Sequence, residues 1–239
     1  MNGALFYAAV AALGNVAGGV AAVRGAKLGL KIISGFVAFG AGFMLSVSLV
    51  RMLPEAIEMG GESAALFVLL GYLLVHLSQH TATEHFHFGE ETHDVTRLAG
   101  VTALIGLLLH TFFDGVAIAS GFNVSTELGL LIFVAVFLHK LPEGLTISSL
   151  QLAGGTSPRA ALASATALGL ATLVGVLVTD WVAFLAANGL ALSAGVTIYV
   201  GASNLVPEFQ GKTGWGLPLA FFLGAGGFFG VSELVGVLL

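Results

Sequence analysis

Cysteine is absent from the 239 residues of this chain. Without thiols the protein can form neither a disulfide framework nor a thiolate metal site, so any metal ion must be bound by nitrogen and oxygen ligands. Proline is scarce as well, with 5 residues, and no stretch rich in proline or serine divides the chain. We therefore expect a single domain over residues 1–239.

Charged residues are also scarce. They make up only 9% of the chain, against about 25% in soluble domains, while 57% of the residues are hydrophobic. The formal net charge of −5 includes no basic cluster, which argues against nucleic acid as a partner. These proportions exclude an ordinary soluble fold and predict an all-α integral membrane protein with the lipid bilayer as its surroundings.

Long apolar stretches are abundant. A helix needs about 20 apolar residues to cross a bilayer core of about 30 Å. Suitable stretches lie at 4–23, 32–53, 63–80, 98–120, 128–150, 160–187, 190–209 and 216–238. The first is long enough to span and has no positive segment before it, so we expect a retained span rather than a signal peptide. The sequence thus predicts eight transmembrane helices, and its 34 glycines favour close helix packing.

The lysines and arginines indicate the orientation of these helices. Most lie in or beside the connections that follow odd-numbered spans, and Arg51 alone lies on the opposite side. The first group comprises Arg24, Lys27, Lys31, Arg97, Arg159 and Lys212. Because basic residues accumulate in cytoplasmic loops, we expect both termini to lie outside the cytoplasm in a multi-pass cell-membrane protein. The connection over 81–97 is then cytoplasmic.

Two short patterns recur along the chain. Ala41-Gly42 followed by Pro54-Glu55 returns as Ala194-Gly195 followed by Pro207-Glu208 at identical spacing. The stretch Leu109-His110-Thr111-Phe112-Phe113-Asp114-Gly115 likewise resembles Leu138-His139-Lys140-Leu141-Pro142-Glu143-Gly144. An odd number of spans separates the members of each pair, so the partners cross the membrane in opposite directions. This pattern predicts an inverted repeat, which in transporters places the site near the membrane midplane.

Ionisable residues gather in the fourth and fifth apolar stretches. His110 and Asp114 are four residues apart and share one helix face, as do His139 and Glu143. A charged side chain at the bilayer centre costs at least about 2.5–3.5 kcal/mol, so such residues are retained where they are paired or functional. Two imidazoles and two carboxylates suit a divalent zinc, iron or manganese ion, and the missing cysteines disfavour copper(I). A proton relay or a set of buried ion pairs is the alternative.

Lys140 places a positive charge directly beside this proposed cation site. Its ammonium either extends toward the membrane surface or pairs with Asp114 or Glu143. Pairing would lower the net negative charge of the site and hold a carboxylate in place when no metal is bound.

Other residues could serve as ligands or line the pathway. Glu55 and Glu208 follow prolines near the ends of the second and seventh spans, where they would either recruit and release ions or be exposed acids at the interface. Met44, in the second span, is either a soft ligand or a packing residue.

Histidines and acids are concentrated around the 81–97 connection. It contains His85 and His87 and follows His80. Such tracts bind metals weakly, and the alternative is a solvated loop without ligands.

At these residues the sequence resembles the ZIP (Zrt/Irt-like protein) family of divalent metal-ion transporters over essentially its whole length. The motifs that carry the resemblance are His110-x-x-x-Asp114-Gly115, His139-x-x-Pro142-Glu143-Gly144 and Val206-Pro207-Glu208. The resemblance implies eight helices in a 3+2+3 inverted-repeat bundle and uptake of zinc, or of iron, manganese or cadmium, into the cytoplasm. By the same likeness His110, Asp114, His139 and Glu143 are ligands, and Met44 matches a position that can contribute.

The chain also departs from the family pattern. Many relatives hold two metals, using a polar residue after the first histidine, an acid after the second and an acid in the sixth span. Here Thr111 and Lys140 stand at the first two positions, and no charged residue lies between Ala160 and Thr179. We therefore expect a single-metal centre, with the Lys140 ammonium in place of the second cation.

Two other functions compete with metal transport. An intramembrane metal-dependent hydrolase would use similar ligands to activate water, but the chain lacks a His-Glu-x-x-His motif. A proton-coupled solute carrier would use the same titratable groups without an obvious surface for recognising a solute. We therefore expect a transporter and no enzyme, and we leave a homodimer open.

Overall fold

A computed structural model describes residues 2–25, 30–82, 97–207, 209–210 and 212–239, and the regular structure in that part of the chain is helical. The elements in chain order are α1 (Asn2–Val23), α2 (Leu30–Val47), the π-helical segment η1 (Ser48–Met52), α3 (Leu53–Gly60), α4 (Glu62–Ala82), α5 (Arg97–Val124), α6 (Thr126–Ala153), α7 (Pro158–Trp181), α8 (Ala183–Tyr199), the π-helical segment η2 (Val200–Leu205) and α9 (Gly216–Leu238).

Eight helical paths within the described residues are long and apolar enough to cross a membrane. The second path joins α2, η1 and α3, and the seventh joins α8 and η2. The other six correspond to single helices. The prediction of an all-α protein with eight spans is therefore confirmed.

The second span runs past the expected end at residue 53 and finishes at Gly60. Pro54 lacks an N–H group and would remove a bond from the interior of a regular helix. Here the helix widens first: the N–H of Leu53 bonds the carbonyl of Ser48 across η1, and Pro54 then occupies the first turn of α3. The π turn thus accommodates the proline inside the span, and the predicted boundary was wrong.

The sixth and seventh spans meet at Val182 instead of between residues 187 and 190. α7 ends at Trp181, Val182 is extended with φ −103° and ψ 104°, and α8 begins at Ala183. Gly189, which lies at the expected boundary, is inside α8. A Cβ there would lie 2.6 Å from the Ser120 Oγ of α5, so this glycine permits close helix packing and marks no turn.

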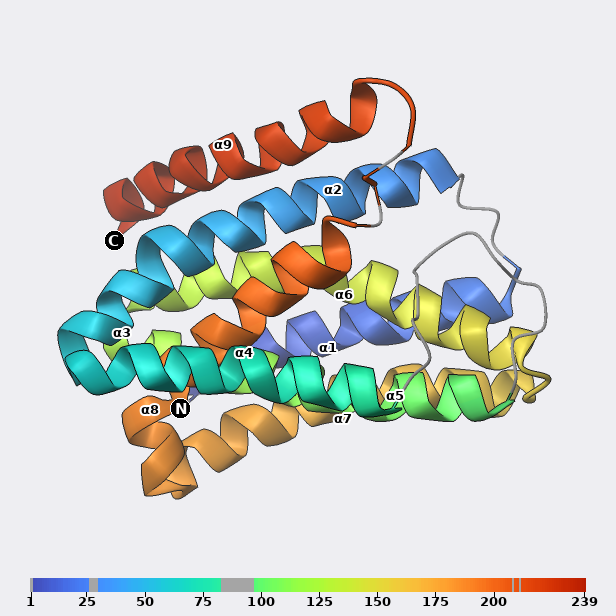
Figure 1. Cartoon of the computed structure of the whole chain (residues 1–239), viewed down its shortest axis with the longest axis horizontal. Coiled ribbons are helices and arrows are strands. Elements are labelled where there is room, and N and C mark those ends of the chain that lie inside the picture. The colour runs from blue at the N-terminus through green and yellow to red at the C-terminus, as the bar shows by residue number, and fades with distance from the viewer. Residues whose placement is uncertain (1, 26–29, 83–96, 208, 211) are drawn as a thin grey trace.

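The helices pack in two sets. In one set, α1 and α5 each contact both α6 and α7. In the other, α2 runs beside α9 and α4 packs on α8 (Figure 1). The sets meet where α2 contacts α6 and where α5 contacts α8. The fourth and fifth spans, α5 and α6, therefore lie together in the first set.

Glycine contacts show the internal symmetry in atomic detail. In the second set, which contains α2, α4, α8 and α9, four glycines lie so close to a backbone carbonyl of a neighbouring helix that a Cβ would overlap it. The contacts are Gly42 with Phe221, Gly195 with Val68, Gly224 with Phe39 and Gly71 with Leu192. The sequence separation between Gly42 and Gly195 is the same as the separation between Phe39 and Leu192, between Val68 and Phe221, and between Gly71 and Gly224. The α2–α9 pair therefore repeats as the α8–α4 pair.

The helices of the first set, α1, α5, α6 and α7, also repeat. Their close contacts are Gly144 with Asn15, Gly115 with Thr172, Gly18 with Leu141 and Gly175 with Phe112. The α1–α6 pair therefore corresponds to the α7–α5 pair, and α5 corresponds to α6. Spans one to three are thus related to spans six to eight around a central pair, which is the predicted 3+2+3 arrangement. Backbone contact of this kind replaces the hydrophobic drive that lipid does not supply.

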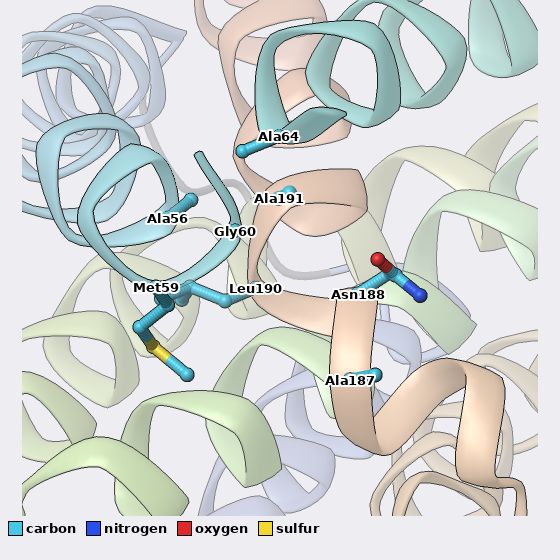
Figure 2. Close-up of a pocket in the computed structure, with 8 residues that line it drawn as sticks. All are labelled: Ala56, Met59, Gly60, Ala64, Ala187, Asn188, Leu190 and Ala191. Atoms are coloured by element: carbon cyan, nitrogen blue, oxygen red, sulfur yellow. The ribbon is translucent and has the colours of Figure 1, made fainter. Parts of the chain in front are cut away.

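A small cavity lies between α3, α4 and α8 (Figure 2). Its volume of about 10 Å³ has room for about one water molecule. The lining residues are Ala56, Met59, Gly60, Ala64, Ala187, Asn188, Leu190 and Ala191. None of them is ionisable, so the cavity supplies no imidazole or carboxylate ligand.

Candidate metal centre

The four predicted ligands converge between α5 and α6. His110 and Asp114 share one face of α5, and His139 and Glu143 share one face of α6. All four side chains are buried. One ligand atom from each residue can be chosen so that the four atoms lie within 4.8 Å of one another. The expected meeting of the two helix faces is therefore present in the structure, and the ligand role of the four residues stays a prediction.

The separations within this cluster suit a small divalent ion. The Nε2 atoms of His110 and His139 lie 3.4 and 3.3 Å from Asp114 Oδ2, and His110 Nε2 lies 3.8 Å from Glu143 Oε1. Zinc binds nitrogen and oxygen at about 2.0–2.2 Å, which at tetrahedral angles leaves neighbouring ligand atoms about 3.4 Å apart. The cluster is thus close to the spacing of a four-ligand site.

His139 directs its Nε2 atom toward the cluster. Its Nδ1 lies 3.0 Å from the carbonyl oxygen of Ala135. A carbonyl can only accept, so Nδ1 carries the proton and donates it, and a neutral ring then has its lone pair on Nε2. That Nε2 faces Asp114 Oδ2. Two acceptors at this distance repel each other unless a cation or proton lies between them, as in a metal site whose histidine is oriented by a carbonyl.

Lys140 is fully buried, with 0% of its side chain exposed. Its Nζ donates to Asp114 Oδ2 at 2.6 Å and to Glu143 Oε2 at 2.9 Å. Of the two alternatives left by the sequence, the structure therefore shows pairing with both carboxylates. Because Nζ and both imidazoles approach the same oxygen of Asp114, a bound ion would compete directly with the ammonium for it.

Glu143 has donors on both of its oxygens. The hydroxyl of Thr111 donates to Oε1 at 2.7 Å, and the side-chain amide of Asn15 donates to Oε2 at 3.0 Å. Asn15 lies on α1 and is completely buried. Asn15 is not among the residues predicted from the sequence, although a polar amide in the middle of an apolar span is a usable signal.

The structure describes three of the remaining predicted site residues. Met44 is buried in α2 within the main hydrophobic core, and Glu55 lies partly buried in the first turn of α3. His80 belongs to the last turn of α4. Glu208, His85 and His87 lie outside the described residues. Ligation or pathway roles for all six remain predictions.

A further ion pair involves neither the four predicted ligands nor Lys140. Arg51 in η1 and Glu127 in the first turn of α6 approach to 2.7 Å, and both side chains are partly exposed. The pair joins the two helix sets. Exposed pairs of this kind contribute at most about 1 kcal/mol.

Comparison with known proteins identifies sequences that are similar to this chain. The family model described as ZIP zinc transporter matches residues 89–234, which include all four candidate ligands. The human protein "Zinc transporter ZIP6" is 32% identical over 174 residues, covering 64% of this chain and 22% of that protein. "Zinc transporter ZIP9-A" of Xenopus laevis is 29% identical over 159 residues, covering 60% of this chain and 52% of its own length. The chain therefore spans about half the length of this ZIP9 relative and about a fifth of ZIP6.

Proposed function

Because this chain belongs to the ZIP zinc transporter family, we propose that it carries divalent transition metal ions across a membrane and into the cytoplasm. Zinc is the preferred cargo, and iron(II), manganese and cadmium are further candidates. The observation that carries the proposal is the buried cluster of two imidazoles and two carboxylates in the centre of a helical membrane protein. Buried ionisable groups are expensive in this setting and indicate a pathway for ions.

We propose that His110, Asp114, His139 and Glu143 bind the ion during passage. Two imidazoles favour zinc and its neighbours over calcium and magnesium, which prefer ligand sets made of oxygen alone. We propose Met44 of the second span as an additional ligand. α2 packs against α6, and this contact supports that assignment.

Charge balance supports a centre that binds an ion and also releases it. Asp114 and Glu143 contribute two negative charges and Lys140 contributes one positive charge, so the empty centre with neutral imidazoles carries one net negative charge. Passage requires binding that is favourable enough for entry yet weak enough for exit. Lys140 weakens the attraction for a divalent ion, and it leaves room for only one.

The basic connections support an orientation with both termini outside the cytoplasm. In that orientation α4 ends and α5 begins on the cytoplasmic side. The residues proposed to line the route outside the centre are Glu55, Glu208, His80, His85 and His87. We treat residues 1–239 as one transport domain.

Uptake by proteoliposomes tests this function. The full chain is reconstituted into vesicles that contain a zinc-sensitive dye, and zinc is added outside. We expect uptake by the parent and loss of uptake in His110→Ala and Glu143→Ala, because each removes a ligand that no cysteine or spare acid replaces. His76→Phe is the matched control, since His76 stacks on Tyr72 in α4 and phenylalanine keeps the ring. Normal uptake by both ligand variants would exclude this centre as the route.

The same preparation tests the competing functions. The relatives are named zinc transporters, so we infer transport without catalysis. Hydrolysis of a peptide or ester substrate that depends on zinc and on His110 would contradict this inference. Proton-driven uptake of an organic solute without metal uptake would indicate a solute carrier. A homodimer is compatible with the function, and the mass of the detergent-solubilised protein tests it.

A further inference from the structure

We propose that Asn15 of α1 is a positioning residue of the metal centre, which holds the Glu143 carboxylate in place for the incoming ion. The inference rests on the proposed function. It adds a third helix to a centre that otherwise consists of side chains from α5 and α6.

The contacts of Asn15 lead directly to the centre. Its Nδ2 donates to Glu143 Oε2 at 3.0 Å and to the backbone carbonyl of Lys140 at 3.2 Å. Its own backbone carbonyl lies against Gly144, where a Cβ would overlap it. The amide therefore reaches Glu143 from a backbone that is fixed next to it, and Asn15 can hold the carboxylate with little freedom of its own.

Glu143 is restrained from three helices at once. Thr111 on α5 bonds Oε1, whereas Lys140 on α6 and Asn15 on α1 both bond Oε2. When a metal ion enters, the ammonium of Lys140 faces a new positive charge, and repulsion weakens its bond to Glu143. The neutral amide of Asn15 is not repelled in the same way, so it remains to orient the carboxylate toward the ion.

The internal symmetry shows that this contact is a specific feature. The position equivalent to Asn15 in the repeat is Thr172 on α7, and Asp114 is the equivalent of Glu143. Thr172 directs its hydroxyl to the carbonyl of Leu168 in its own helix, at 3.5 Å. Asp114 therefore receives no donor from Thr172, and the two carboxylates of the centre are held differently.

The environment of the Asn15 Oδ1 atom indicates that this residue is more than a packing residue. Oδ1 is buried and has no hydrogen-bond partner among the described residues. A buried acceptor without a partner is destabilising, and a leucine of similar size would fill the same space without that penalty. The donor on Nδ2 is what an asparagine supplies here that leucine cannot.

Zinc binding by the full chain in detergent tests the proposal. Asn15→Leu is expected to raise the zinc dissociation constant by about tenfold, the scale of one hydrogen bond to a charged group. Thr172→Val, the control at the equivalent position, should stay within about twofold because its hydroxyl bonds only its own helix. In proteoliposomes Asn15→Leu should raise KM more than it lowers the maximal rate. If Asn15→Leu does not fold, Asn15→Ser replaces it, because serine is too short to reach Glu143.

A second measurement needs no metal. In the metal-free protein, Asn15→Leu and Glu143→Met should change the melting temperature by amounts that do not add in the double variant, because both changes break the same contact. Additive effects would overturn the proposal, as would zinc binding by Asn15→Leu or Asn15→Ser equal to that of the parent. In the latter case, loss of binding in His110→Ala shows that the proposed function still stands. Failure of the parent itself to bind zinc would overturn both.

Discussion

Replacing Lys140 with aspartate should raise the metal capacity of the centre above one ion. In the parent the ammonium lies 2.6 Å from Asp114 Oδ2 and 2.9 Å from Glu143 Oε2. These are the oxygens that a second cation between the carboxylates would need. A fixed positive charge already occupies that position, so we expect one metal ion per chain.

The repulsion that excludes a second ion can be worked from this geometry. A divalent cation about 4 Å from an ammonium is disfavoured by about 8 kcal/mol at an effective dielectric constant near 20. That energy corresponds to a loss of about six orders of magnitude in affinity. In Lys140→Asp the interaction becomes attractive. The new position stays poorly coordinated, however, because Thr111 supplies only a hydroxyl and α7 carries no charged side chain between Ala160 and Thr179.

Equilibrium dialysis followed by elemental analysis counts the bound zinc. We expect one zinc per chain in the parent and a second, weakly bound zinc in Lys140→Asp. Lys140→Met is the matched control, because it removes the charge without adding a ligand, and it should bind one ion more tightly than the parent. Two firmly bound ions in the parent would refute the reasoning, since the ammonium would then have to vacate the centre.

Three further predictions follow from the packing and the connections. Gly42→Ala should destabilise the protein by about 1–3 kcal/mol in denaturant unfolding, because its Cβ would overlap the Phe221 carbonyl, whereas Gly226→Ala, with no atom within 4 Å of the new Cβ, should be neutral or stabilising. Arg51→Ala should change stability by at most about 1 kcal/mol and should leave zinc binding at the centre intact, as measured by calorimetry. Deleting residues 84–94 should change the rate of zinc uptake by proteoliposomes without abolishing it, and complete loss in a folded deletion would make this connection an obligatory part of the route.

The number of helices and the position of the centre could be predicted because both depend on strong local signals. Eight long apolar runs allow few alternatives in a bilayer. His110 and Asp114, like His139 and Glu143, are four residues apart, so one helical turn brings each pair onto a common face. The repeated motif then indicated that the two faces belong to equivalent helices, and the glycine contacts confirm it.

The errors arose where tertiary packing overrides a local signal. Pro54 normally interrupts a helix, but the π turn in η1 had already altered the hydrogen bonding before it. Gly189 lies at a predicted span boundary, yet it is inside α8, where it permits close contact with Ser120 of α5. Nothing within α1 indicates that the Asn15 amide meets Glu143, because that contact exists only once α1 packs against α6.

Anomalous diffraction at the zinc absorption edge, on crystals of the full chain grown with zinc, tests the central claim most directly. We predict one strong peak between α5 and α6, within bonding distance of His110 Nε2, His139 Nε2 and a carboxylate oxygen of Asp114. The peak should be absent in His110→Ala. A centre that stays empty at saturating zinc while the same preparation transports zinc would contradict the account, because the metal would then cross the membrane by another route.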